Sequence, residues 1–329
     1  MKQKKGLPNQ VQSPDKTTGD NGASGQGGQS RPLRVINFVG RRYIWYAISL
    51  LLVVPGLISF FLNGLNLGID FTGGNLMQVS FSQSVESEQV RAVLAKADLA
   101  KTPVVQTTTS GEFLIRTEEL SEEQSDALIT ALTGELGQME ILRNEKVGAI
   151  IGGELARKAI LAMSIASVLI LLYITLRFEF RFGLAAIVSL LHDALVVIGV
   201  FSLFQIEVDS SFVAALLTIL GYSINDTIVI FDRIRENRKN YPRLEMVEMV
   251  NRSITQTLTR SINTVLTVVF VLVALHFFGG ETTKVFTLAM LIGVVSGCYS
   301  SIFNASPLWV DFMRMGKNKF RKLNAFARS

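Results

Sequence analysis

Gly221–Asn237 reads Gly-Tyr-Ser-Ile-Asn-Asp-Thr-Ile-Val-Ile-Phe-Asp-Arg-Ile-Arg-Glu-Asn. This stretch begins inside an apolar run long enough to cross a bilayer and ends in charged residues. Asn225 and Asp226 nevertheless lie within the apolar part. An aspartate at the centre of a membrane helix costs ~2.5–3.5 kcal/mol to insert, so an aspartate in such a place is a candidate functional residue by default. We therefore expect a membrane protein with a functional carboxylate in this span.

The composition of the whole chain agrees with a membrane solvent. Of its 329 residues, 49% are hydrophobic and only 18% are charged, which predicts a polytopic membrane protein. The net charge is +5, but the lysines and arginines form short clusters between apolar runs, where they orient helices, so we expect no nucleic-acid partner. One cysteine and two histidines are too few for an intrachain disulfide or a zinc site, so neither metal nor cofactor is expected.

The spacing of the apolar runs sets the domain plan. We predict a membrane all-α protein with six transmembrane helices and a ferredoxin-like α+β extracytoplasmic domain between helices 1 and 2. The apolar runs cover about 43–62, 159–176, 183–204, 211–231, 254–278 and 285–312. The predicted parts are a disordered cytoplasmic tail (1–34), a first transmembrane helix (35–63), the extracytoplasmic domain (64–152), a five-helix transmembrane bundle (153–313) and a basic cytoplasmic tail (314–329).

Basic residues near the ends of the spans predict the orientation. They cluster before the first span, in the 177–182 turn, in the 232–253 loop and after the last span, which all fall on one side if six helices cross. The opposite turns, 205–210 and 279–284, carry one lysine between them. We therefore expect both termini in the cytoplasm of a multi-pass protein of the bacterial inner (plasma) membrane. A thylakoid membrane also fits this pattern.

The segment between the first two spans has a pattern of its own. Residues 76–81 alternate as a strand, 85–99 have apolar residues at helical spacing, and two short strands flank Ser110-Gly111 as a hairpin. A second helix begins with the capping box Ser-Glu-Glu-Gln at 121–124, and a final strand follows at 139–147. The order β-α-β-β-α-β predicts the split βαβ arrangement of ferredoxin-like domains.

A glycine-rich turn precedes this domain. Gly68-Ile-Asp-Phe-Thr-Gly-Gly74 places Gly68, Gly73 and Gly74 around Asp70. Such a turn can cradle an anion or a metal, or it can be a tight exit turn packed against the helices. No second carboxylate cluster lies nearby in the sequence, so we favour the packed turn.

Together these residues resemble the SecF family. The resemblance rests on Gly68–Gly74 after the first span, His192-Asp193 in the third, the Gly221–Asn237 block in the fourth, and Thr-Arg-Ser-Ile-Asn-Thr at 259–264 in the fifth. It implies one six-helix half of the resistance-nodulation-division type, driven by protons, that requires SecD and works with the Sec protein-conducting channel. The implied substrate is a translocating preprotein, and the implied surroundings are membrane lipid.

Asp226 is the first candidate for a proton path. It must find either a partner or a proton, because an unpaired charge is costly inside a membrane. Arg260, near the start of the next span, can pair with it and hold it ionised, or it can extend to the interface as an anchor. The SecF resemblance favours the pair, since that family has an aspartate and an arginine at the matching positions.

Asp193 and a stripe of small residues complete the candidate set. Asp193, near the middle of the third span, is either a second station on the proton path or a group that fixes packing through serine or threonine hydroxyls of another helix. Asn225 is expected to bridge helices. Gly293 and Gly297 lie on one face of the sixth span, so they suit either packing within the chain or contact with SecD.

Two other classes of function must be weighed. A proton-coupled lipid or drug exporter of the same superfamily would also carry carboxylates in the fourth span, but it ordinarily needs two large outer domains and twelve spans. An intramembrane enzyme would need a catalytic motif, and the chain has neither His-Glu-x-x-His nor Gly-x-Ser-x-Gly. We therefore expect a transport subunit and no enzyme.

Overall fold

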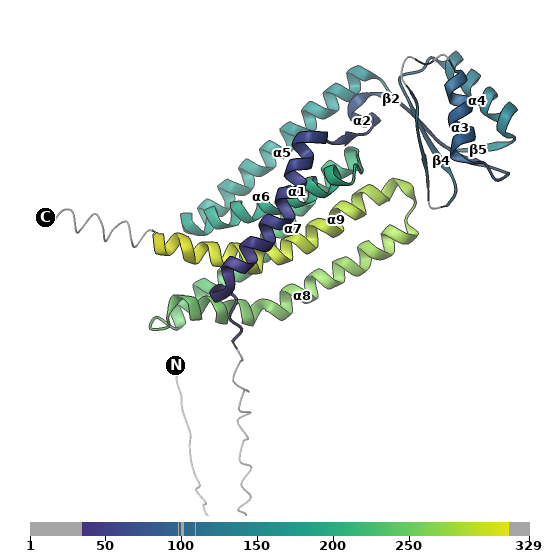
Figure 1. Ribbon diagram of the computed structural model, residues 1–329. Coiled ribbons are helices and arrows are strands. Elements are labelled where there is room, and N and C mark those ends of the chain that lie inside the picture. Colours follow the sequence, from purple (N-terminus) through teal and green to yellow (C-terminus); the bar gives the residue numbers. More distant parts are fainter. Residues whose placement is uncertain (1–34, 98, 100–101, 109, 316–329) are drawn as a thin grey trace, which may run out of the picture. The chain divides into compact units, whose positions relative to one another are not determined.

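The structure, a computed structural model, describes residues 35–97, 99, 102–108 and 110–315. The predicted tail at 1–34 and most of the tail at 314–329 lie outside these residues. Within them, six helices are long and apolar enough to cross a membrane (Figure 1). They are α1 (Arg42–Asn63), α5 (Ala149–Arg177), α6 (Phe180–Leu203), α7 (Ser210–Asn240), α8 (Met246–Phe278) and α9 (Glu281–Ser300).

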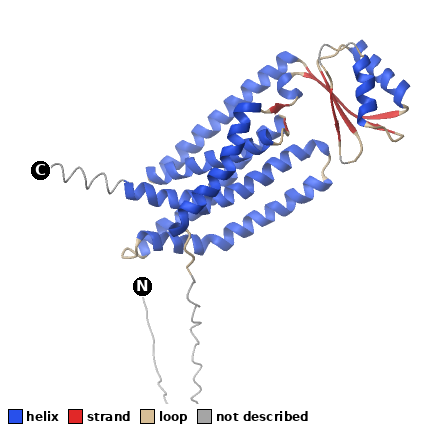
Figure 2. Cartoon of the chain, in the orientation of Figure 1, coloured by secondary structure: helices blue, strands red, loops and turns tan. Residues whose placement is uncertain are grey.

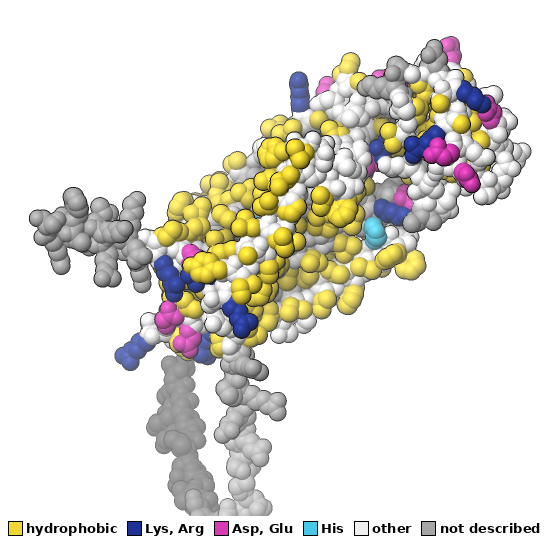
Figure 3. All heavy atoms as spheres, viewed as in Figure 1, with side chains coloured by type: hydrophobic (Ala, Val, Ile, Leu, Met, Phe, Trp, Pro, Cys, Tyr) yellow, Lys and Arg dark blue, Asp and Glu magenta, His cyan; other side chains and the backbone are white. Residues whose placement is uncertain are grey.

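The surface of the helices matches a lipid solvent. Figure 3 shows hydrophobic side chains over the flanks of the helices, with charged side chains gathered toward their ends. Helix α5 is the clearest case, because only 6% of its most apolar stretch is buried inside the protein. Helices satisfy their backbone hydrogen bonds internally, so a mostly exposed helix is stable in hydrocarbon. The chain is a multi-pass membrane protein, and the predicted fold class is confirmed.

The α+β domain lies between α1 and α5 in the sequence, and it holds the four-stranded sheet (Figure 2). The sheet order is β3-β4-β2-β5, with every neighbouring pair antiparallel, as the ferredoxin-like prediction requires. Helices α3 and α4 supply the other half of its core, which includes Val79, Val90 and Leu132. The elements are β2 (Gly74–Phe81), α3 (Ser87–Lys96), β3 (Val104–Thr107), β4 (Phe113–Thr117), α4 (Glu122–Leu136) and β5 (Met139–Val147).

Glycines let the helix backbones approach closely. A Cβ added to Gly56 of α1 would overlap the backbone of Gly199 in α6, so these two helices meet where neither has a side chain. Small residues at helix crossings are the usual means of membrane helix association, since lipid gives no hydrophobic force between helices. The crossing of α1 and α6 therefore depends on both glycines.

Helix α9 continues through a π-helical segment. Ser301–Ala305 forms this segment, labelled η2, and the span runs on to Met315. Pro307, two residues beyond the segment, has no backbone N–H to donate, so the regular hydrogen-bond ladder is interrupted there. The Ser306 hydroxyl donates to the carbonyl oxygen of Ser301 at 3.1 Å, which adds a side-chain hydrogen bond at this point.

We predict that a polypeptide of residues 68–150 folds by itself, because its core is built from its own helices and strands. Leu132→Ala should lower its free energy of unfolding by about 2–5 kcal/mol, since Leu132 is fully buried. Glu123→Gln is the control on the same helix, with an exposed side chain and an expected change within about 0.5 kcal/mol. Circular dichroism during urea unfolding measures both, and a noncooperative transition in the parent polypeptide would contradict the prediction.

Candidate functional site

Helix α7 positions the polar side chains that the sequence placed inside the membrane. Asp209 caps its N-terminus by accepting a hydrogen bond from the backbone N–H of Phe212 at 2.9 Å. From there, Ser223, Asp226 and Thr227 lie on one side of the helix, because residues three and four apart are neighbours on a helical surface. Each of the three meets a different neighbouring element.

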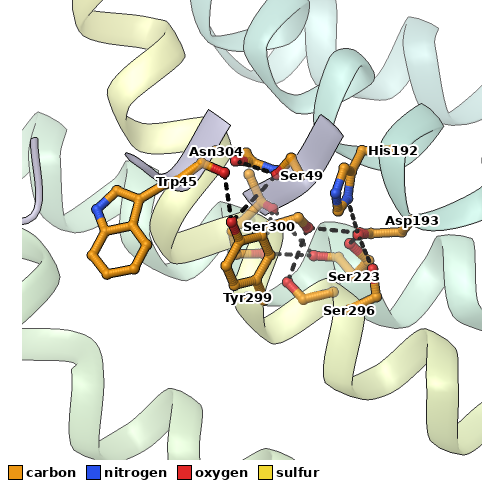
Figure 4. A network of polar contacts seen from close by, with 12 residues as sticks. Trp45, Ser49, His192, Asp193, Ser223, Ser296, Tyr299, Ser300 and Asn304 are labelled. Carbon is orange, nitrogen blue, oxygen red and sulfur yellow. Dashed lines mark hydrogen bonds and ion pairs between the residues drawn. The ribbon is translucent and has the colours of Figure 1, made fainter. Parts of the chain in front are cut away.

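Asp193 of α6 is fully buried and accepts four side-chain hydrogen bonds (Figure 4). One carboxylate oxygen accepts from Ser223 of α7 at 2.6 Å and from Ser300 of α9 at 2.7 Å. The other accepts from Ser296 of α9 at 2.8 Å and contacts His192 Nδ1 at 3.0 Å. A carboxylate is an acceptor with about four lone-pair sites, so these donors match its capacity. Of the two predicted alternatives, the serine contacts that fix helix packing are present. We call these five residues the Asp193 network.

A second set of polar contacts extends from this point toward α1. The Tyr299 hydroxyl donates to the carbonyl oxygen of Trp45 at 2.7 Å, and the amide of Asn304 donates to the Ser49 hydroxyl at 2.8 Å (Figure 4). The hydroxyls of Thr227 and Ser301 lie 2.8 Å apart and join α7 to the π-helical segment. Helices α1, α6, α7 and α9 are therefore tied together by side-chain hydrogen bonds inside the membrane-spanning region.

Gly293 and Gly297 pack within the chain. A Cβ on Gly297 would lie 3.0 Å from the Cβ of Ser223, and a Cβ on Gly293 would overlap Ile219. Both neighbours belong to α7, so the small face of α9 is what allows α7 to approach. This close approach also brings the Ser296 and Ser300 hydroxyls to Asp193.

Asp226 meets serine instead of the expected arginine. Its Oδ1 accepts a hydrogen bond from the Ser261 hydroxyl of α8 at 2.6 Å, while its Oδ2 is buried without a partner among the residues that the structure describes. Arg260 is exposed and forms no ion pair within that part of the chain. The reason is geometric: consecutive residues point about 100° apart around a helix axis, so only one of the two can face α7. In this structure Asp226 therefore has a serine donor, and its pairing with Arg260, which the resemblance favours, stays a prediction.

Further polar side chains lie where α7 and α8 are in contact, a region that we call the α7–α8 seam. The Tyr222 hydroxyl donates to the carbonyl oxygen of Thr264 at 3.1 Å, which adds a second link between these helices. Asn225, expected to bridge helices, is exposed, as is Asn263 on α8. The structure therefore presents uncompensated polar groups along two membrane spans, beside Asp226.

The glycine-rich turn is packed against other parts of the chain. Gly73 and Gly74 have φ values of +74° and +128°, and a Cβ at either position would collide with Ala149 or with the carbonyl oxygen of Thr117. The Asp70 carboxylate accepts from the backbone N–H of Ser210 at 2.8 Å, so it caps the start of α7. Gly68 donates its N–H to the carbonyl oxygen of Val208 at 2.8 Å. These contacts agree with the packed turn that the sequence favoured.

Sequence reasoning missed an ion pair near this turn. Arg116 of β4 bonds to Glu207, which lies in the two-residue strand β6 (Glu207–Val208) that pairs with β1 (Asn66–Leu67). Burial raises the pKa of Glu207 above its usual value, and the charge of Arg116 opposes that rise. Neither residue belongs to a recognisable motif. Arg116 lies in the inserted domain and Glu207 in the short connection between α6 and α7, so no local sequence pattern links them.

Comparison with known proteins identifies the family. Residues 128–315 match the family described as protein export membrane protein SecD/SecF, C-terminal, and residues 58–85 match the SecD/SecF GG motif. The first match covers more than half of the chain. The chain belongs to the SecD/SecF family. The Gly68–Gly74 turn is thus part of the GG motif of this family, and the Asp193 network lies in its C-terminal region.

Relatives of similar length carry the SecF name. The protein translocase subunit SecF of Sebaldella termitidis is 43% identical, with 81% of this chain and 88% of the relative aligned. The corresponding subunit of Thermobaculum terrenum is 44% identical over 85% of this chain and 96% of the relative. These relatives are components of a transport machine. Among family members, the chain is therefore a SecF-type subunit of the protein-export machinery.

Two solved structures share the fold. The crystal structure of SecDF from Thermus thermophilus, a translocon-associated membrane protein, aligns with a TM-score of 0.79 at 40% identity over 85% of this chain. A SecDF in a super-membrane-facing form aligns with a TM-score of 0.65. This chain spans only about two fifths of those SecDF chains, 39% and 40% respectively.

We predict that Asp193→Asn lowers the thermal stability of the protein, because one acceptor oxygen becomes an NH2 group that faces existing donors. The expected loss is about 1–3 kcal/mol, larger than that for Ser300→Ala, which removes one hydrogen bond and should cost about 1 kcal/mol. Glu236→Gln, at an exposed position on α7, is the control. Unfolding in detergent, followed by circular dichroism, would contradict the network's role if Asp193→Asn melted with the parent protein.

Proposed function

We propose that this chain acts with SecD to convert the proton-motive force into work on a preprotein that crosses the membrane. The observation that carries the proposal is Asp226, a carboxylate within a membrane span that has one hydrogen-bond donor and one unpartnered buried oxygen. The unpartnered oxygen leaves an acceptor site at which this carboxylate can take up a proton. The comparisons favour protein export over the lipid or drug exporter, and a transport role over an enzyme.

The exposed polar residues beside Asp226 support SecD as the partner. Asn225, Arg260 and Asn263 lie within apolar spans, yet they are exposed in the single chain. Polar groups facing lipid are costly, so another protein surface should cover them. The solved SecDF chains are more than twice as long as this one, which leaves room for a second half. We infer that SecD covers this face.

Contacts with the Sec channel, with the preprotein and with lipid extend the proposal. The Thermus thermophilus SecDF is described as translocon-associated, and its likeness to this chain supports a contact with the channel. A preprotein emerging from the channel is then the substrate on which the α+β domain acts. The apolar flanks of the helices would face membrane lipid (Figure 3).

We further propose that both termini and the α7–α8 connection are cytoplasmic. Arg177 and Arg181 near the α5–α6 turn, and the basic residues at the end of α7, lie on the side that the positive-inside rule assigns to the cytoplasm. The α+β domain is then extracytoplasmic. A bacterial plasma membrane is the setting most consistent with the relatives, and the same argument holds for a thylakoid membrane.

A rotation of α8 about its own axis would switch Asp226 between its protonated and ionised forms. Ser261 faces Asp226 in this structure, and Arg260 precedes it by one residue. If α8 turned about its axis by one residue, Arg260 would replace Ser261 opposite Asp226. A neutral Asp226 is compatible with the serine hydroxyl, whereas the arginine cation would favour the ionised carboxylate. One proton crossing 100 mV supplies ~2.3 kcal/mol, so several protons are needed for a large movement. In this scheme Asp193, which contacts α7 and α9 through serine hydroxyls, is a second group that binds the proton along its path.

We predict that Asp226→Asn abolishes proton-dependent stimulation of export, because asparagine keeps the size and hydrogen bonding of aspartate but cannot change its charge. Asp232→Asn is the matched control on the same helix; Asp232 is part exposed and lies 3.5 Å from Arg177. The measurement is preprotein import into inverted membrane vesicles with and without a proton gradient, with SecD present. Normal stimulation in Asp226→Asn would show that this carboxylate is structural.

Substitutions of Arg260 test the rotation. Arg260→Ala removes the cation and should abolish the stimulated part of export, while Arg260→Lys keeps the charge and should retain part of it. The double variant with Asp226→Asn should be no worse than either single one, because both disable one switch. If Arg260→Ala supports export like the parent protein while Asp226→Asn does not, Arg260 is an interfacial anchor.

A further inference from the structure

His192 occupies an unusual position in the Asp193 network. Its Nδ1 lies 3.0 Å from Asp193 Oδ1, and since an ionised carboxylate only accepts hydrogen bonds, Nδ1 carries the hydrogen. Its Nε2 is buried and has no partner among the residues described by the structure, although the side chain is only 9% exposed. In the neutral ring this second nitrogen is an acceptor. The imidazole is thus bound at one end and free to accept a hydrogen bond at the other.

Ser189 provides a matching polar group on the same helix. It lies three residues before His192, so both side chains are on one face of α6. Ser189 is 1% exposed, and its hydroxyl also has no partner within the described part of the chain. Serines elsewhere in the bundle, such as Ser164 and Ser253, donate to the carbonyl four residues earlier at 2.8 Å. Ser189 makes no such bond, so its hydroxyl is available to donate.

We propose that His192 is a proton-transfer group for Asp193 and receives its proton on the Ser189 side. A hydronium ion gives its proton to Nε2 and leaves as water, and the Ser189 hydroxyl keeps its own hydrogen. The Nδ1 proton then moves to Asp193 Oδ1 across the 3.0 Å contact, and the ring is left neutral with its hydrogen on Nε2. One proton passes from hydronium to the ring and one passes from the ring to the carboxylate, so the step balances and Ser189 is unchanged. The distance is within the reach of direct transfer.

The surroundings of His192 allow this step without loosening the helices. Asp193 is its charged neighbour, and the Tyr299 ring, centred 6.0 Å away, is the titratable group with a recorded contact from α9. The remaining contacts of the carboxylate are hydroxyls from α7 and α9. After transfer, Asp193 donates to Nδ1 and still accepts from these serines. The network therefore changes its charge while α6, α7 and α9 stay joined.

The role of the relay rests on the proposed proton-driven function, but its chemistry can be measured independently of export. The chain has two histidines, and His276, hydrogen-bonded to Thr287 at 2.9 Å, is an internal control. Slow deuterium exchange at the imidazole C2–H follows ring protonation, so mass spectrometry of the full-length protein with SecD in vesicles gives a pH profile for each ring. We expect a sigmoidal profile for His192. In Asp193→Asn the His192 profile should differ from that of the parent protein, because the contact with the carboxylate is lost, while the His276 profile serves as the internal reference.

An export assay gives the second readout. His192→Asn places an amide N–H where Nδ1 was, so it keeps the bond to Asp193 but cannot relay a proton. We expect normal co-purification with SecD and loss of the proton-stimulated part of export. Full stimulation in His192→Asn, or a His192 exchange profile that is the same in Asp193→Asn, would overturn the relay. The two failures can be told apart: if the relay is overturned while Asp226→Asn is inactive, the proposed function still stands, whereas an active Asp226→Asn contradicts the proposed function as well.

Discussion

A buried carboxylate organises the membrane part of this protein. Asp193 is surrounded by apolar helices, where an unsatisfied charge is not tolerated, so donors must converge on it from several directions. They come from α6, α7 and α9, and they reach it only because Gly293 and Gly297 let α9 lie against α7. The hydrogen bonds to Asp193 therefore depend on the close packing of the α7 and α9 backbones.

The helices of the bundle differ in the side-chain contacts that join them. Helices α1, α6, α7 and α9 share side-chain hydrogen bonds and glycine contacts. Helix α8 meets the middle of α7 through the Asp226–Ser261 and Tyr222–Thr264 contacts, and 11% of its most apolar stretch is buried. Under the proposed function, a change of protonation at Asp226 would act on α8 through these two contacts. Asp226 lies at the α7–α8 seam.

The GG motif joins the α+β domain to the same helix. Asp70 binds the backbone N–H of Ser210 at the start of α7, and Gly68 binds the strand that precedes it. The glycines that follow adopt positive φ values and lie against backbone atoms, so larger residues would displace the contacts. Helix α7 thus carries the proton-binding candidate in its middle and the anchor of the α+β domain at its end. A single helix therefore joins Asp226 to the contact that holds the α+β domain.

Some of these features follow from the sequence alone, because they depend on local periodicity and hydropathy. The number of spans, the β-α-β-β-α-β order of the inserted domain and the cost of Asp226 in an apolar run are properties of short windows. The resemblance at Gly221–Asn237 added the family. In contrast, the partners of each polar side chain depend on how each helix is rotated about its own axis. Ser261 faces Asp226 and Arg260 does not, since about 100° separates them, and only packing against neighbouring helices sets that rotation. For the same reason, the four donors to Asp193 and the unpartnered Nε2 of His192 became visible only in the tertiary structure.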